Sequence, residues 1–343
     1  MESFKKHIPA FAALLSNIDP TSISAGAYPQ QYLKDLLLHK IHYLSLYASV
    51  LDRAFEATDK TPDETCLLDF GCGNGLLALF AKFCGVKEVH ASDMNAPFLL
   101  AAQQLSKALN IELSGWLIGN ENTLIEYFDG KQLDVLVGTD VIEHVYSLDN
   151  LFRVIKQLNP QMGTVFTTAS VAENPFKSRQ LKKLMIQDEL AGSNKFHSTY
   201  TGEFAGLPFL TIRNKLIAKK YPSLTESEVK ELAIASRGLA ADDIYKDVEE
   251  YLISKKFPSP IHHSFNTCDP ITGSWTERLL TTKEYEQLYK RYQFSVQIHN
   301  GFYNEFETGL KSKLSLLLNK AIDLLGKKAI TISPFIFLVG RKD

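Results

Sequence analysis

The sequence predicts an α/β fold in which helices cover both faces of a parallel sheet. Between residues 64 and 170, short apolar runs typical of strands alternate with segments of helical periodicity, and this alternation favours a parallel sheet. The composition, with 45% hydrophobic and 22% charged residues over 343 positions, is that of an ordinary globular protein. The expected strands cover residues 65–70, 88–93, 112–118, 133–139 and 163–169.

The segment before the first strand is expected to be helical. Its apolar residues recur at steps of three and four, for example at Leu36, Leu44, Tyr47 and Leu51, which places them on one helical face. Pro62 ends this region. We therefore predict an N-terminal helical extension over residues 1–62.

After the fifth strand the alternation stops for about 100 residues. A capping box, Thr225-Glu226-Ser227-Glu228, predicts a helix through Ala235 in this stretch, and a second helix is expected over 242–255. The core pattern then returns, with a helix over 281–292, a strand over 294–303, a long amphipathic helix over 305–325 and a last strand over 330–340. The predicted organisation is an extension over 1–62, a core over 63–170, a mainly helical insertion over 171–270 and completion of the core over 271–343.

Charge and cysteine content exclude several classes of protein. A net charge of −2 argues against constitutive nucleic-acid binding, which needs a strongly basic face, so no nucleic-acid partner is expected. The four cysteines form no Cys-x-x-Cys pair and are interpreted as reduced thiols of a cytoplasmic protein. No apolar run of 18 residues predicts a membrane span, and the weak signal-peptide likeness near Lys5 is interrupted by Pro9.

The most informative motif is the run Thr-Cys-Leu-Leu-Asp-Phe-Gly-Cys-Gly-Asn-Gly at residues 65–75. An apolar strand leads into Asp69 and then into glycines at 71, 73 and 75, which allow a tight turn and close approach of the backbone to a ligand. Neither a dinucleotide fingerprint nor a P-loop is present, because Leu76 replaces the third dinucleotide glycine and no Gly-Lys-Ser/Thr follows.

Four motifs in order resemble the class I S-adenosylmethionine-dependent methyltransferases. The first is the glycine loop, and the second is the strand Glu88-Val89-His90-Ala91-Ser92-Asp93, whose acidic end lies 24 positions after Asp69. The third, residues 133–145, is similar to the quinone O-methyltransferase branch, and the fourth is the strand at 163–170. Before this strand the family usually has Pro-Gly-Gly, whereas this chain has Pro160-Gln161-Met162-Gly163. The resemblance implies a Rossmann-like seven-stranded sheet with an antiparallel edge formed by the last two strands.

The resemblance also implies a cofactor, S-adenosylmethionine, whose product is S-adenosylhomocysteine, and residues that bind it. Asp69 and the loop at Gly71, Cys72 and Gly73 would hold the methionine end, and Asp93 would accept the ribose hydroxyls. Met94 would pack on the adenine, Asn120 would meet the adenine amino group, and Asp140 would lie near the sulfonium. Structural roles stay open for the single residues, since Asp69 could cap the next helix and Met94 could belong to the core.

Glu143 and His144 are the candidates for proton handling. They follow the fourth strand, and ligands of open α/β sheets bind at the carboxyl ends of strands. His144 could accept a proton from a phenol, enol or hydroxyl near neutral pH, or it could cap the following helix. The quinone branch associates the glutamate with a divalent ion, but no catalytic metal is expected here because one carboxylate does not make a site.

Residues of the insertion and of the last strands are the candidates for acceptor binding. A turn-rich segment over 266–278 holds Trp275 and could be a lid, a substrate wall or an anchor of the insertion. The adjacent His262 and His263 are poorly spaced for a metal site. The further candidates are Tyr200, Arg237, His299 and Tyr303.

The leading functional prediction is a methyltransferase acting on a small-molecule acceptor by in-line displacement, with oxygen or carbon favoured because no Asn/Asp-Pro-Pro-Tyr/Phe motif follows the fourth strand. One alternative is an enzyme that methylates a protein or RNA, with the insertion as the docking surface. The other is a regulatory subunit that binds the cofactor without turnover. The acceptor and the oligomeric state are left open.

Overall fold

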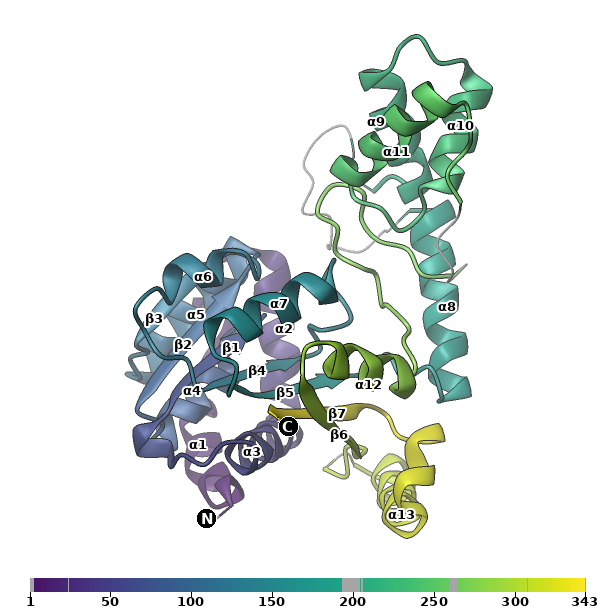
Figure 1. Cartoon of the computed structure of the whole chain (residues 1–343). Helices are drawn as coiled ribbons and strands as arrows, with labels where there is room; N and C mark the ends of the chain where they lie inside the picture. Colours follow the sequence, from purple (N-terminus) through teal and green to yellow (C-terminus); the bar gives the residue numbers. More distant parts are fainter. Residues whose placement is uncertain are drawn as a thin grey trace. The chain divides into compact units, whose positions relative to one another are not determined.

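The computed structural model describes residues 3–23, 25–192, 204, 206–259, 265–306 and 308–342. The chain divides into two compact units (Figure 1). The first, here called the sheet unit, comprises residues 1–142, 147–174 and 281–343, and the second, the insertion unit, comprises 143–146 and 175–280. Residues 143–146 thus group with the insertion, although residues 140–142 before them group with the sheet.

Seven strands form one sheet in the order β3-β2-β1-β4-β5-β7-β6. Strands β1 to β5 pair in parallel with one another, whereas β7 is antiparallel to both of its neighbours, β5 and β6. The carboxyl ends of β1, β2 and β4 therefore meet at one edge, where the glycine loop begins. The strands are β1 (Cys66–Phe70), β2 (Glu88–Asp93), β3 (Gly115–Ile118), β4 (Val135–Thr139), β5 (Gly163–Thr168), β6 (Phe294–Asn300) and β7 (Ile336–Lys342).

Helices cover the two faces of the sheet, as the alternation in the sequence predicts. Helices α3 and α4 contact each other, with α3 against β4, β5 and β7, and α4 against β1 and β2. Helix α7 contacts α6 and α12, and α12 contacts β6 (Figure 1). The central strands β1 and β5 are buried along their whole length, including Asp69 of β1 and the threonines of β5. The helices of this unit after β1 are α4 (Leu76–Phe83), α5 (Ala96–Leu109), α6 (Thr123–Tyr127), α7 (Leu148–Leu158), α12 (Thr282–Arg291) and α13 (Leu310–Leu325).

The N-terminal extension is helical, as predicted, and belongs to the sheet unit. Its helices are α1 (Ile8–Leu15), α2 (Ala27–Leu38) and α3 (Lys40–Glu56). The predicted apolar face of α3 is buried, with Leu44 and Leu51 fully inaccessible. Together with Phe11 of α1, these side chains join the same apolar core as the strands.

The insertion unit is helical and has a small apolar core of its own. Its helices are α8 (Pro175–Leu190), α9 (Phe209–Lys220), α10 (Glu226–Ala235) and α11 (Ala241–Ser254). The predicted capping box is present at the start of α10, because Glu228 N donates to Thr225 Oγ1 and Thr225 N donates to the Glu228 carboxylate. The core cluster comprises Ile217, Val229, Leu232, Ala233, Ile244, Val248 and Tyr251.

The C-terminal elements differ in their boundaries from the prediction. The last strand begins at Ile336 rather than at residue 330, since a 3₁₀ helix spans Gly326–Thr331 and Pro334 has no N–H to donate to a ladder. Helix α13 begins at Leu310, five residues later than expected. Only β7 runs antiparallel, because it inserts between β5 and β6 and leaves β6 at the edge. Among the described residues, no helix is both long and apolar enough to cross a membrane.

Candidate active site

The glycine loop connects β1 to α4 and has a left-handed backbone at all three glycines. Their φ angles are 70° at Gly71, 52° at Gly73 and 72° at Gly75. A Cβ on Gly71 would lie 2.3 Å from Cγ2 of Val141, which follows β4, so this position excludes any side chain on two grounds. The N–H groups of Gly71 and Cys72 donate to the Ser92 carbonyl at 2.8 and 2.9 Å, which fixes the loop against the end of β2.

Asp93 ties the end of β2 to the same loop. Its Oδ2 accepts a hydrogen bond from Gly73 N at 2.9 Å, and its Oδ1 accepts one from Asn95 N at 2.8 Å. Burial raises the pKa of this carboxyl, while the two backbone donors oppose the rise. The carboxylate is therefore oriented by the loop at the strand end, where a ligand with hydroxyl groups would meet it.

Asp69 lies on β1 immediately before the loop and is buried. Its Oδ2 accepts a hydrogen bond from Ala78 N in the first turn of α4 at 3.1 Å, so the helix-capping role left open by the sequence is present. Burial raises the pKa of Asp69 to about 7, and the neighbouring Asp93 adds to the rise. A cationic group of a ligand beside this carboxyl would favour its ionised form.

Two exposed apolar side chains stand at neighbouring strand ends. Met94 follows β2 and is 54% exposed, and Ile118 ends β3 and is 58% exposed. Asp93 and Ile118 are register partners, so the two side chains lie beside adjacent strand ends. Asn120, two residues further on, accepts from Asn122 N through Oδ1 at 3.1 Å and so forms an Asx turn before α6. Its side-chain oxygen is thus engaged locally.

Helix α2 lies against the glycine loop, which the sequence did not reveal. Asn74 of the loop is buried and donates through Nδ2 to the Pro29 carbonyl at 3.0 Å. A Cβ on Gly73 would lie 3.5 Å from Cε1 of Tyr32. Tyr28 and Tyr32 also make edge contacts with Phe98 of α5, with ring centroids 5.1 and 5.5 Å apart. The i, i+4 spacing of these tyrosines was the only available signal in the sequence.

Asp140 places a carboxylate just past β4. Its backbone is left-handed, with φ of 50°, and its N–H donates to the Thr167 carbonyl at 3.1 Å. The pKa of Tyr32 and that of Tyr43 are raised first by burial and then by the charge of Asp140. The structure therefore brings Asp140 near Tyr32 of α2 and Tyr43 of α3.

Glu143 and His144 belong to the insertion unit, where they pair with the turn-rich segment around Trp275. Trp275 N donates to the His144 carbonyl and Arg278 N to the Glu143 carbonyl, both at 3.1 Å. His144 Nδ1 lies 2.7 Å from the Trp275 carbonyl. Because a carbonyl oxygen only accepts, Nδ1 carries the proton, and Nε2 of the neutral ring keeps its lone pair. Trp275 is thus brought together with both proton-handling candidates.

The other acceptor candidates have contacts of their own. Arg237 donates to the backbone carbonyls of Phe265 and Asn266, and Tyr303 donates its hydroxyl to the Ile332 carbonyl at 2.8 Å, so both side chains have structural partners. His299 lines a cavity of about 350 Å³ in the sheet unit, and burial lowers its pKa. Tyr200, like His262 and His263, lies outside the described residues.

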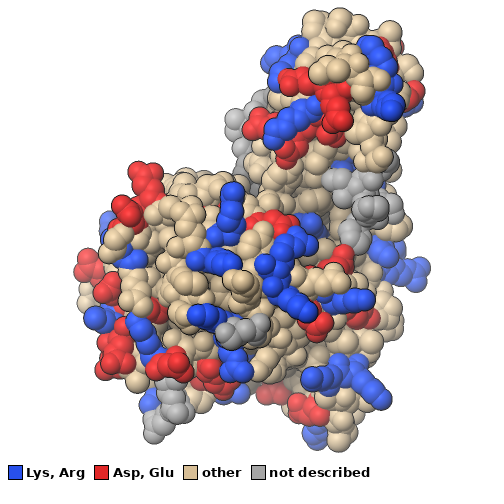
Figure 2. All heavy atoms as spheres, viewed as in Figure 1, with Lys and Arg blue, Asp and Glu red and all other residues tan. Residues whose placement is uncertain are grey.

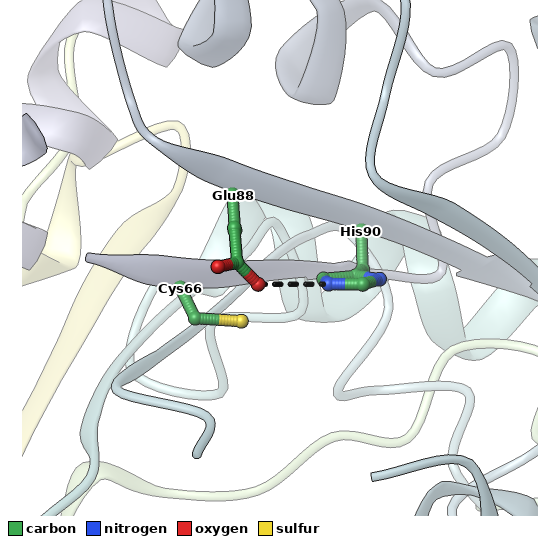
Figure 3. A group of neighbouring side chains, drawn as sticks. All are labelled: Cys66, Glu88 and His90. Carbon is green, nitrogen blue, oxygen red and sulfur yellow. Dashed lines mark ion pairs between the residues drawn. The ribbon is translucent and has the colours of Figure 1, made fainter. Parts of the chain in front are cut away.

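Two groups of described side chains have the residue types of a metal site. Glu143, His144 and Glu277 offer ligand atoms within 4.8 Å of one another. So do Cys66, Glu88 and His90, at the sheet edge opposite the glycine loop (Figure 3). His90 Nε2 is 4.0 Å from the Glu88 carboxylate, and Nδ1 is 2.9 Å from the Tyr127 hydroxyl. Burial raises the pKa of the Cys66 thiol to about 12, so a cation would have to displace its proton.

The sheet order and the left-handed glycine loop agree with the Rossmann-like methyltransferase fold that the resemblance implied. Residues 37–204 match the family model described as a methyltransferase domain. This part of the chain is therefore a methyltransferase domain, as the resemblance of its motifs predicted. The finer likeness to the quinone O-methyltransferase branch stays a prediction.

Similar proteins carry the same class name. A ribosomal protein L11 methyltransferase of Anoxybacillus flavithermus is 26% identical over 136 residues, which is 39% of this chain and 40% of that protein. A ribosomal protein L11 methyltransferase of Acinetobacter baumannii is 36% identical over 75 residues, which is 21% of this chain and 23% of that protein. The chain thus spans less than half the length of the curated relatives it matches.

Among solved structures, a putative S-adenosylmethionine-dependent methyltransferase of Listeria monocytogenes is 9% identical, with a TM-score of 0.42, over 86% of this chain and 99% of that one. The magnesium protoporphyrin IX methyltransferase of Synechocystis PCC 6803, solved with bound SAH, is 11% identical, with a TM-score of 0.39, over 91% and 87%.

Proposed function

We propose that the protein transfers a methyl group from S-adenosylmethionine to an acceptor. The observation that carries the proposal is the Asp93 carboxylate bonded to Gly73 N, beside a left-handed glycine loop at the carboxyl edge of the sheet. The bound cofactor supplies an electrophilic methyl group on a sulfonium. Because such a displacement needs alignment more than covalent chemistry, the protein's task is to hold, orient and desolvate the reacting groups.

Each cofactor-binding residue has a role that its chemistry supports. Asp93 retains acceptor capacity for ribose hydroxyls after taking two backbone donors, and Asp69 beside the loop suits the ammonium of the methionine part. The loop at 71–73 lies against this part of the ligand. Met94 and Ile118 offer apolar surface to the adenine, and Asp140 offers negative charge to the sulfonium. The backbone near Asn120 suits the adenine edge better than its engaged side-chain oxygen does.

Proton removal from the acceptor is assigned to His144 Nε2. The bond from Nδ1 to the Trp275 carbonyl fixes the tautomer and the ring orientation, as a general base requires. Glu143 precedes it and shares the Glu143–His144–Glu277 group, so it would modulate the local charge. No catalytic step is assigned to a metal ion.

A small-molecule acceptor is favoured, with oxygen or carbon as the methylated atom. Helix α2 contacts the glycine loop through the Asn74–Pro29 bond and through Tyr32. Tyr32 and Tyr43 lie near Asp140, whose charge adds to the rise of their pKa caused by burial. Aromatic side chains beside the cofactor loop suit a compact acceptor that packs against them.

A protein acceptor is the second candidate. It is favoured by the names of the curated relatives described above, which are ribosomal protein L11 methyltransferases. In this alternative the insertion unit would bind the substrate protein.

The test is to incubate the purified protein with methyl-labelled S-adenosylmethionine and cell extract, and to follow the label into small-molecule, protein and RNA fractions. Label in small molecules supports the leading proposal, and label in protein supports the second candidate. Confirmed cofactor binding without any transfer would favour a regulatory subunit.

The cofactor assignment has a test of its own. Asp93→Ala removes the carboxylate proposed for the ribose, so affinity for S-adenosylhomocysteine, measured by calorimetry, should fall at least about tenfold. Asp129→Ala, an exposed aspartate in the turn before β4, is the matched control and should bind normally. Unchanged affinity of Asp93→Ala would contradict the assignment.

A further inference from the structure

Helix α13 of the sheet unit exposes a row of leucines. Leu310, Leu314, Leu317 and Leu324 are 85%, 57%, 64% and 87% exposed, and Leu325 beside them is 49% exposed. Successive residues of an α-helix are turned by about 100°, so the first four side chains fall within about 80° of one another. They form one apolar row, here called the leucine stripe, along the length of the helix.

The side of α13 that faces the protein is the more polar one. Asn319 accepts from Tyr303 N through Oδ1 at 2.7 Å and donates through Nδ2 to the Tyr303 carbonyl at 3.1 Å. Ser312 donates to the Glu305 carbonyl at 2.9 Å, and Ile322 is the buried residue of the helix. Surface helices of globular proteins normally turn their apolar face inward. These bonds fix the opposite orientation, with the leucine stripe outward.

Lysines flank the leucine stripe on both sides. At 100° per residue, Lys313 and Lys320 lie on one side of its centre and Lys311 on the other. Residues 310–328 contain five lysines and one aspartate, a net charge of +4 in a chain whose net charge is −2. Lysine or arginine side chains lie on the surface where Figure 1 places α13 (Figure 2).

We propose that the leucine stripe docks α13 on an anionic lipid surface. The leucines would enter the boundary between headgroups and acyl chains, and the lysines at the margins would extend to anionic headgroups, as in interfacial amphipathic helices. A second copy of the chain fits less well, because two stripes packed face to face would bring lysines of the same charge together. This association goes beyond the methyltransferase reaction and does not depend on it.

The full-length protein should sediment with vesicles of phosphatidylcholine and phosphatidylglycerol at 7:3, and much less with pure phosphatidylcholine vesicles. Leu314→Ser/Leu317→Ser removes exposed side chains and should weaken the association by about tenfold or more without loss of folding. Lys313→Glu/Lys320→Glu should weaken it by about tenfold or more, and added salt should weaken it in the wild type.

The matched control is Ile253→Ser, because Ile253 is 87% exposed on a helix of the insertion unit, and this variant should bind vesicles as the wild type does. The proposal is overturned if the wild type does not sediment with anionic vesicles, or if Leu314→Ser/Leu317→Ser leaves sedimentation unchanged. A concentration-dependent dimer in analytical ultracentrifugation that Leu314→Ser/Leu317→Ser abolishes would assign the stripe to a second copy instead.

Discussion

The sheet unit and the insertion unit are each stabilised internally by different interactions. The sheet unit has an apolar core in which strands such as β1 are buried from end to end. The insertion unit has a smaller apolar cluster and, in addition, a buried ion pair between Arg213 of α9 and Glu189 of α8. Arg213 also donates to the Ala233 carbonyl at 2.8 Å, and Glu189 accepts from the Thr267 hydroxyl at 2.7 Å.

This difference explains why one unit is easy to interpret from its sequence and the other is not. A fully buried parallel strand is a near-continuous apolar run, as in β1 apart from Asp69, and such a run is visible in the sequence. A buried charge is tolerated only where partners from distant segments converge on it, and here they come from α8, α9, α10 and Thr267. The same difference predicts that the units respond separately to substitution.

The largest effect is expected from Glu189→Ala. It leaves the Arg213 charge buried without its carboxylate, which typically costs about 3–5 kcal/mol. Hydrogen exchange should show lost protection of α8, α9 and α10, while the sheet stays protected. Glu249→Ala, which removes an exposed partner of Lys220, is the control and should change stability by less than about 1 kcal/mol. Lost protection of the sheet in Glu189→Ala would show that the units unfold together.

His144→Ala should affect turnover, proposed to depend on the insertion unit, without affecting cofactor binding, proposed for the sheet unit. If His144 is the base, turnover should fall by about a hundredfold or more, because general-base catalysis contributes that much. Affinity for S-adenosylhomocysteine should not change, since the proposed cofactor site lies in the sheet unit. Trp275→Phe keeps the carbonyl that holds His144 and should reduce turnover far less. Full activity of His144→Ala would leave the histidine with a structural role.

Gly71→Ala tests the close packing of the loop. The added Cβ meets Val141 in a left-handed backbone, and we expect about 2 kcal/mol of lost cofactor affinity, roughly thirtyfold. Gly130→Ala is a matched control, with φ of 68° and no atom near the added Cβ, so it carries the backbone strain alone. Equal cofactor affinity in the two variants would remove packing from the explanation.

A further effect concerns pH and Asp69. With a folded pKa of about 7 against an ordinary 3.8, the ligand-free protein loses stability as pH rises between these values, because the folded state retains the proton that the unfolded state releases. A ligand ammonium beside Asp69 requires the ionised form. Affinity for S-adenosylhomocysteine should therefore rise about tenfold per unit from pH 5 to pH 7 and then level off. Calorimetry of Asp69→Asn should show a flat profile over this range.

Much of the sheet unit was predictable because its signals are local. The five parallel strands were found close to where they were expected, since hydrophobic period acts over a few residues. The capping box at Thr225 of the insertion unit was found for the same reason, because cap chemistry is also local. The start of the last strand was wrong by six residues, because a 3₁₀ helix and Pro334 interrupt an apolar run that continues in the sequence. The approach of α2 to the loop was not predicted, because Asn74 and Pro29 meet only after folding.

The sequence by itself determined the class of the protein: spaced glycines, acidic strand ends and apolar runs predicted a cofactor-binding α/β domain, because backbone freedom and strand burial depend on neighbouring residues. Only the tertiary structure decided that Asp93 bonds Gly73, that His144 is oriented by Trp275 and that the leucines of α13 face outward. Asp93 and Gly73 are 20 positions apart, and His144 and Trp275 are 131 apart. The Asn319–Tyr303 bond that orients α13 joins residues 16 positions apart. No local sequence pattern encodes these contacts.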